Sequence, residues 1–162
     1  MAKQMPKRRS TIFLIDDDTS FRRALARVMT SAGLDYLAFG SADDFLAARP
    51  ATRSGCIVAN MTQPGLNGLD LIRALNDRPS GLPLIFLTAH DTTESRAATH
   101  EAGAAGYFRK PVDTQALLDA IHWALNEHER SDNSSLFSIR IRQSLHREHE
   151  NIEPKNRSCQ YR

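Results

Sequence analysis

Short apolar runs alternate with stretches of helical periodicity along most of the chain, and this alternation constrains the fold more than any other feature of the sequence. Five runs have the composition of buried strands: TIFLI (11–15), LDYLAF (34–39), CIVA (56–59), PLIFL (83–87) and GYF (106–108). Strands that alternate with helices through short connections predict a parallel sheet covered on both faces. We therefore expect an α/β fold with a doubly wound, five-stranded parallel sheet.

The stretches between these runs carry helix signals. Gly33 would end the first helix, and Asp113 would cap the last. One helix is unusual, because TTESRAATHEA (92–102) offers only alanines to a core; we expect it to be the most loosely held. The helices are expected at 21–33, 41–48, 69–77, 92–102 and 113–128.

Composition divides the chain into three parts: a basic arm at 1–10, a folded domain at 11–128, and a polar and basic tail at 129–162. The arm lacks the apolar core of a secretory signal. In the tail, LFSIRI (136–141) alternates like a strand, yet Ile141, Leu145 and Ile152 would share one helix face. Periodicity alone leaves both structures open for this segment.

Several classes of protein are disfavoured by the same sequence. No apolar run approaches the roughly 20 residues needed to span a membrane. Cys56 lies in a predicted buried strand, far in sequence from Cys159, so we expect no disulfide framework and a cytoplasmic location. The net charge of +2 is too small to argue for nucleic acid, and HREH (146–149) is interpreted as a solvated charged segment rather than a metal site.

Polar residues follow four of the predicted strands where each strand ends. They are Asp16, Asp17 and Asp18, then Asn60, Thr88, and the pair Arg109 and Lys110. Because the carboxyl ends of parallel strands meet at one edge of a sheet, we expect these side chains to converge there.

Four motifs in this order resemble the receiver domains of two-component response regulators: FLIDDD (13–18), NMTQPGLNG (60–68), FLTAH (86–90) and YFRKP (107–111). The resemblance covers about residues 10 to 128 and implies the flavodoxin-like receiver fold. It also implies a role in phosphorelay signalling. We expect no enzymatic activity, because no Ser/His/Asp or Cys/His set has a suitable context in this sequence. Related regulators often carry a C-terminal DNA-binding output domain, and nothing in the tail matches one.

The resemblance implies a role for each matching position. Asp16, Asp17 and the backbone carbonyl of Thr62 would hold Mg²⁺, and Asn60 would stand at the phosphoacceptor position, where the family has aspartate. The remaining four positions would form the phosphoryl-binding and switch group: Thr88, Lys110, Tyr107 as the mobile aromatic, and Pro111 after a cis bond.

Asn60 changes the expected chemistry. A carboxamide is a far weaker nucleophile than a carboxylate, and it removes one of the charges that attract Mg²⁺. We therefore expect a pseudo-receiver with weak or absent Mg²⁺ binding, which works by protein contact without phosphorylation. Gln63, where the family usually has Met or Leu, is a second departure that bears on the apolar packing of the loop.

The expected partner is a signalling protein, either a histidine kinase, a phosphotransfer protein or a downstream regulator. It would bind the last two strand–helix units, which include Tyr107 and Trp123. The sequence leaves a homodimer open as well. Two alternatives stay open. Asn60 is the near-isosteric change that an experimenter would choose to disable an ordinary phosphorylated regulator, or the chain is a truncated DNA-binding regulator that uses its basic tail.

Overall fold

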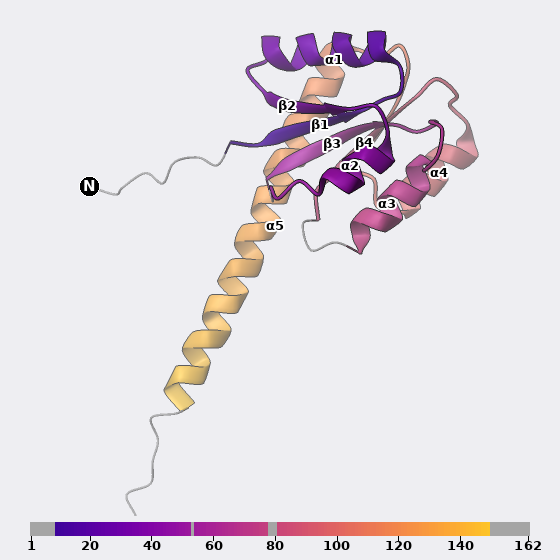
Figure 1. Ribbon diagram of the computed structural model, residues 1–162. Coiled ribbons are helices and arrows are strands. Elements are labelled where there is room, and N and C mark those ends of the chain that lie inside the picture. The colour runs from indigo at the N-terminus through magenta and orange to yellow at the C-terminus, as the bar shows by residue number, and fades with distance from the viewer. Residues whose placement is uncertain (1–8, 53, 78–80, 150–162) are drawn as a thin grey trace, which may run out of the picture. The chain divides into compact units, whose positions relative to one another are not determined.

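The computed structural model describes residues 9–52, 54–77 and 81–149, and the side chains of 133–149 lie outside this description. Strands and helices alternate along the chain (Figure 1). Their bounds are β1 (Thr11–Ile15), α1 (Thr19–Ser31), β2 (Asp35–Phe39), α2 (Ala42–Ala48), β3 (Gly55–Asn60), α3 (Gly68–Asn76), β4 (Leu84–Thr88), α4 (Thr93–Glu101), β5 (Gly106–Arg109) and α5 (Thr114–His149).

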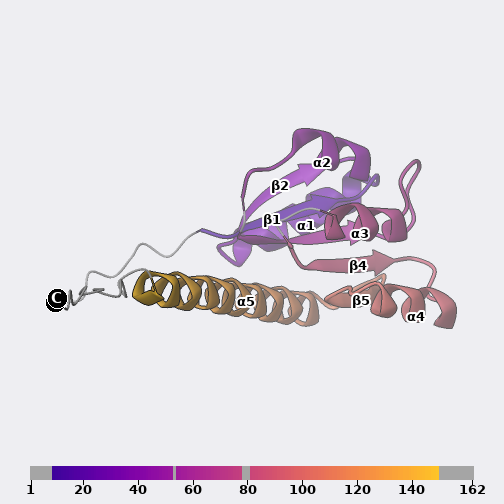
Figure 2. The ribbon, with the colours of Figure 1, turned by 90° about the horizontal axis from the view of Figure 1, so that it is seen from below.

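The five strands form one parallel sheet in the order β2-β1-β3-β4-β5, which confirms the predicted fold class (Figure 2). The chain moves from β1 outward to β2, and then returns to place β3 on the other side of β1. The order of the strands therefore reverses between β1 and β3. In sheets of this kind a crevice opens at that point beyond the carboxyl ends of the strands, and Asn60 is the last residue of β3.

Two apolar layers hold the sheet, one on each face. Every residue of β3 and β4 is buried, as expected for central strands that pack helices on both faces. One layer joins α1 and the first part of α5 to the sheet, with Ile12, Leu14, Leu25, Met29, Val58, Leu117 and Ile121 among its members. The other joins α2 and α3, with Phe13, Ile15, Phe45, Ile57, Leu71, Ile72 and Phe86 among its members.

The helix ends differ from the predicted ones for local reasons. α1 begins two residues earlier than expected because the Asp18 carboxylate accepts hydrogen bonds from the backbone N–H groups of Ser20 and Phe21, at 2.9 and 3.1 Å. The predicted cap of α5 is confirmed, since Asp113 accepts from the N–H of Ala116 at 2.8 Å.

The helix after Asp113 is much longer than 113–128. α5 continues to His149, so the strand alternative for 136–141 is wrong. Residues 129–149 contain neither glycine nor proline, and no strong stop signal interrupts the helix there. The chain divides into two compact units, Met1–His128 and Glu129–Arg162.

α4 packs with few apolar side chains, as its sequence predicts. Thr99 is its one buried residue, and the Thr99 hydroxyl donates to the helix's own carbonyls at Ser95 and Arg96. Cys56 is a free, buried thiol in β3, while Cys159 lies outside the described residues. Within the described ranges, no helix is both long and apolar enough to cross a membrane.

Candidate functional site

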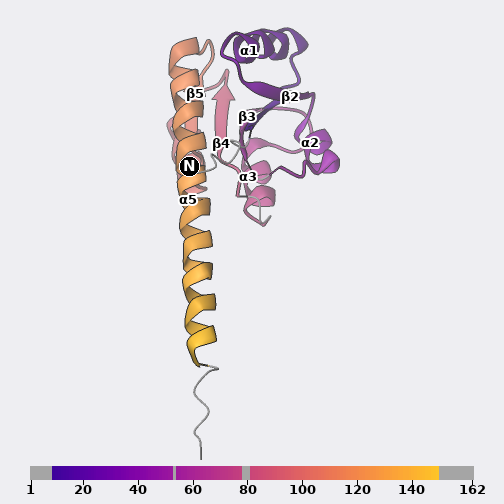
Figure 3. The same cartoon turned by 90° about the vertical axis from the view of Figure 1, so that its left-hand side faces the viewer.

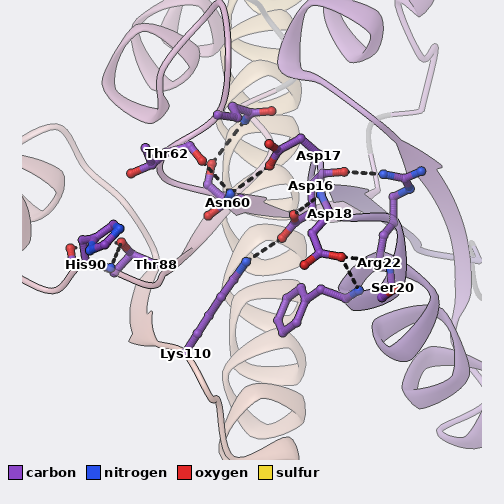
Figure 4. A network of polar contacts seen from close by, with 12 residues as sticks. Asp16, Asp17, Asp18, Ser20, Arg22, Asn60, Thr62, Thr88, His90 and Lys110 are labelled. Atoms are coloured by element: carbon purple, nitrogen blue, oxygen red, sulfur yellow. Dashed lines mark hydrogen bonds and ion pairs between the residues drawn. The ribbon is translucent and has the colours of Figure 1, made fainter.

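The carboxyl ends of β1, β3 and β5 bring together a connected group of polar side chains (Figure 4). Asp16 and Asp17 follow β1, Asn60 ends β3, and Lys110 follows β5. Their convergence, expected from the sequence, is seen for these four residues. They form two hydrogen-bonded sets, one around the Asn60 amide and one around the Asp16 carboxylate.

In the first set, the Asn60 amide joins two acceptors that belong to different loops. Its Nδ2 donates to Oδ1 of Asp17 at 3.2 Å and to the backbone carbonyl of Thr62 at 2.6 Å. The Asn60 residue is only 9% exposed, so water competes weakly for these bonds. The two protons of the amide thus hold together two oxygens that would otherwise repel each other.

The orientation of the amide follows from the character of its neighbours. A carboxylate and a carbonyl are both acceptors, and only the NH₂ end of a carboxamide can satisfy them. Gln63 closes the loop from the other side, because its Nε2 donates to the Asn60 backbone carbonyl at 3.2 Å. Gln63 is buried, and its hydrogen bond to Asn60 takes the place of the apolar packing that Met or Leu would provide in this loop.

In the second set, the Asp16 carboxylate is almost fully buried and is paired on both oxygens. Oδ2 accepts from Lys110 Nζ at 2.8 Å, and Oδ1 accepts from the N–H of Asp18 at 2.9 Å. The Lys110 ammonium also lies 3.9 Å from the centre of the Phe21 ring, close enough for a cation–π contact. Lys110 is therefore held by Asp16 and Phe21 in this arrangement.

Not all of the predicted residues enter this group. The Asp18 side chain caps α1 and points to that helix, and Arg109 is exposed. Thr88 is fully buried, and its hydroxyl exchanges hydrogen bonds with the backbone of His90, donating to the carbonyl and accepting from the N–H, each at 3.1 Å. Figure 4 shows this pair apart from Asn60 and Lys110.

Tyr107 lies against the start of α4. The guanidinium of Arg96 stacks over its ring at 5.1 Å and also pairs with Asp91 at 2.5 Å. Burial of the Tyr107 hydroxyl and the nearby Asp91 charge raise the Tyr107 pKa, while Arg96 opposes them. The Tyr107 hydroxyl and Oδ1 of Asp91 are both buried without a hydrogen-bond partner in the described part of the chain. The Lys110–Pro111 peptide bond is cis, as the resemblance implied.

The oxygens at this site are of the type that Mg²⁺ prefers, but their arrangement does not suit a cation. Asp17 Oδ1 and the Thr62 carbonyl share the amide protons of Asn60, and Asp16 is paired with Lys110. A cation between those two oxygens would face the amide hydrogens. Throughout the described residues, no group of three or more His, Cys, Asp or Glu side chains forms a metal site.

Two residues that contact the site, Arg22 and Phe21, were not predicted from the sequence. Arg22 donates from Nη1 to the Asp16 backbone carbonyl at 2.5 Å, and Phe21 forms the surface on which the Lys110 ammonium rests. They are the third and fourth residues after Asp18, and this closeness in sequence to the aspartates was the available signal. Helical periodicity places Phe21 on the core-facing side of its helix, but it does not show that the ring also contacts the Lys110 ammonium.

Comparison with known proteins agrees with this geometry. A model of the response regulator receiver domain matches residues 12–122. The transcriptional regulatory protein TdiR of Thauera aromatica is 39% identical over 116 residues, which cover 72% of this chain and 51% of TdiR. The response regulator protein TodT of Pseudomonas putida is 33% identical over 123 residues, which cover 76% of this chain and 54% of TodT. The chain thus spans about half the length of these curated relatives.

Solved structures show the same similarity. The response regulator StyR superposes with a TM-score of 0.74 at 33% sequence identity, covering 83% of this chain and 68% of the StyR chain. The FixJ-N structure superposes with a TM-score of 0.68 at 30% identity, covering 75% of this chain and 96% of the FixJ-N chain.

Proposed function

This chain belongs to the response regulator receiver family, and we propose that it is a receiver module of two-component signalling that acts by protein contact, without phosphorylation of residue 60. Receiver domains interact with histidine kinases and with downstream effectors, and they typically bind Mg²⁺ in the acidic pocket. Asn60 stands at the position where the family accepts a phosphoryl group.

One observation carries the proposal: the Asn60 amide bridges Asp17 and the Thr62 carbonyl at 3.2 and 2.6 Å. Attack on phosphorus needs an ionised carboxylate oxygen, which an amide lacks. The hydrogen bonds also satisfy the oxygens that a cation would otherwise neutralise. The site is therefore complete without phosphoryl group or metal, and Mg²⁺ binding is weak because it requires both bonds to break.

The switch residues are consistent with a site that does not recruit them. The Thr88 hydroxyl is engaged with His90, and Lys110 is engaged with Asp16 and Phe21. In this state the ammonium and the hydroxyl have internal partners, and no phosphoryl oxygen is needed to satisfy them. We place the partner contact on α4, β5 and the first part of α5, because Trp123 is 57% exposed there and α4 has little apolar anchoring.

The chemical half of the proposal is tested with acetyl phosphate and Mg²⁺. The wild-type mass stays unchanged, while Asn60→Asp gains one phosphoryl group if Asp16, Asp17 and Lys110 remain competent. A phosphoryl adduct mapped to residue 60 of the wild-type protein would overturn the proposal. Absence of labelling in both proteins would show that Asn60 is not the only change that disables the site.

The contact half is tested with the purified cytoplasmic part of a histidine kinase or a phosphotransfer protein from the same genome. Trp123 is the single tryptophan, so its emission reports directly on the proposed face. Binding is expected to shift the emission to shorter wavelength, and acetyl phosphate is expected to leave the affinity unchanged. In isothermal titration calorimetry, which does not depend on Trp123 emission, Trp123→Ala should weaken binding, whereas replacement of the exposed Arg73 on α3 should not. Binding that requires a phosphodonor would contradict the proposal.

A further inference from the structure

A second surface of the domain lies away from the proposed contact face, at the opposite edge of the sheet. Here α1 and the edge strand β2 border an open groove of about 510 Å³. In Figures 1 and 3 β2 lies directly beside α1. The groove is lined by Arg23, Ala26, Arg27, Thr30, Ser31 and Tyr36.

β2 presents free backbone groups along this edge. It pairs only with β1 in the sheet formed by the described strands. The Phe39 carbonyl accepts from the N–H of Asp16 on the β1 side. Because the direction of the N–H and C=O groups alternates along a strand, those of Tyr36 and Ala38 point away from β1. Tyr36 and Leu37 are exposed large apolar residues, at 38% and 52%.

The helix that borders this edge is positively charged. α1, TSFRRALARVMTS, contains three arginines and no acidic residue. Arg22 is engaged with Asp16, but Arg23 and Arg27 are exposed and have no ion pair or hydrogen bond among the residues that the structure describes. They are four residues apart, so two like charges sit side by side on one helix face, which is unfavourable until an anion joins them.

We propose that this edge binds an extended acidic segment of a partner protein, which adds a strand beside β2. Its backbone would pair with the free N–H and C=O groups of Tyr36 and Ala38, and alternate side chains would face α1. Alternate residues of a strand are about 6.6 Å apart, close to the spacing of about 5–6 Å between neighbours four residues apart on a helix. Two acidic side chains of the segment therefore match Arg23 and Arg27.

The charge pattern selects a partner over the chain's own arm. Residues 1–10, MAKQMPKRRS, carry four basic and no acidic side chains, so they offer no anion to Arg23 and Arg27. Arg9 instead pairs with Asp35 at the start of β2, at 3.9 Å. This binding is independent of the phosphoacceptor site, so it stands whether or not the proposed function is correct. It would let the module hold one protein at β2 while α4, β5 and α5 face another.

The probe is a fluorescein-labelled peptide of alternating Glu and Val, measured by fluorescence anisotropy with the full chain. Two control peptides share its length: one alternates Lys and Val, and one keeps the Glu–Val side chains but is N-methylated at alternate backbone nitrogens, which removes the strand-pairing donors. We expect the acidic peptide alone to bind, with an affinity that falls as salt rises. The amide resonances of Tyr36 and Ala38 should shift on binding.

The protein variants test whether the arginine charges bind the peptide, while thermal melts show whether each variant is folded. Arg23→Ala combined with Arg27→Ala should weaken binding about tenfold. Arg73→Ala, an exposed arginine on α3, should leave the affinity unchanged, and thermal melts should show both variants folded. The proposal is overturned if the acidic peptide fails to bind, if the double variant binds like wild type, or if the N-methylated peptide binds equally well.

Discussion

Replacing Asn60 by aspartate should destabilise the metal-free protein, although the two side chains are nearly the same size. The change removes two hydrogen bonds and sets a carboxylate oxygen about where Nδ2 stands, 3.2 Å from Oδ1 of Asp17 and 2.6 Å from the Thr62 carbonyl. Losing the bond to the Thr62 carbonyl costs about 1 kcal/mol, and losing the bond to the charged Asp17 carboxylate costs about 2 kcal/mol. Two like charges at that separation repel by about 5 kcal/mol at an effective dielectric of about 20, before solvent relieves most of it.

The expected net loss is about 2–4 kcal/mol, because the variant can relax by turning the new carboxylate outward. For a domain of this size, that corresponds to a midpoint roughly 10 °C lower. Thermal melts with and without Mg²⁺ measure the effect in one experiment. Mg²⁺ at about one hundred times its Kd should restore roughly 2.7 kcal/mol to the variant and change the wild-type midpoint little.

Asn126→Asp is the matched control, because Asn126 is exposed on α5 and the substitution adds the same charge. Its midpoint should stay near that of wild type with or without Mg²⁺. If Asn60→Asp is as stable as wild type without metal, the amide does not hold Asp17 and Thr62 together. If Mg²⁺ raises both midpoints equally, residue 60 is not beside the cation.

Three further predictions follow from the packing. Amide hydrogen exchange should be faster in α4 than in α1, because Thr99 is the only buried residue of α4; equal protection would mean that another segment covers it. Lys110→Met should lower the free energy of unfolding in urea by about 3 kcal/mol, because it leaves the buried Asp16 carboxylate without its cation. Arg73→Met, which breaks an exposed pair with Asp70, is its control and should cost less than about 1 kcal/mol. Burial raises the Cys56 pKa to about 12, so little of its thiol is ionised at lower pH. In a Cys159→Ser background, alkylation of Cys56 at about pH 8 should therefore require unfolding. Rapid alkylation of the native protein would refute this prediction.

The sheet could be predicted from the sequence because its central strands are buried on both faces, and such strands appear as continuous apolar runs. The same pattern predicted where the carboxyl ends of the strands lie, and so it placed Asp16, Asn60 and Lys110 at one edge of the sheet. The length of α5 could not be predicted in this way. Alternation in LFSIRI suits either structure, and the absence of glycine and proline over 129–149 allows a helix without requiring one.

The bonding within the site was beyond sequence reasoning for a different reason. Motif spacing indicates that Asn60 and Asp17 are close, but not that the amide donates to both Asp17 and the Thr62 carbonyl. The direction of the Thr88 hydroxyl depends on the backbone of His90, two residues away, and the contact of Lys110 with Phe21 depends on the height of α1 above the sheet. These are differences of a few ångströms, and a pattern of residue types does not contain them.

The Asn60 amide protons occupy the place between Asp17 and the Thr62 carbonyl. Nuclear magnetic resonance of the isotope-labelled protein observes these two protons directly, with Asn60→Asp to assign them. Both protons should exchange slowly with solvent, shift when Asp17 is replaced by Ala, and stay in place at Mg²⁺ concentrations that saturate the Asn60→Asp variant. Fast exchange typical of an exposed amide, or displacement by the same Mg²⁺ concentration, would show that the Asn60 amide does not bridge Asp17 and Thr62.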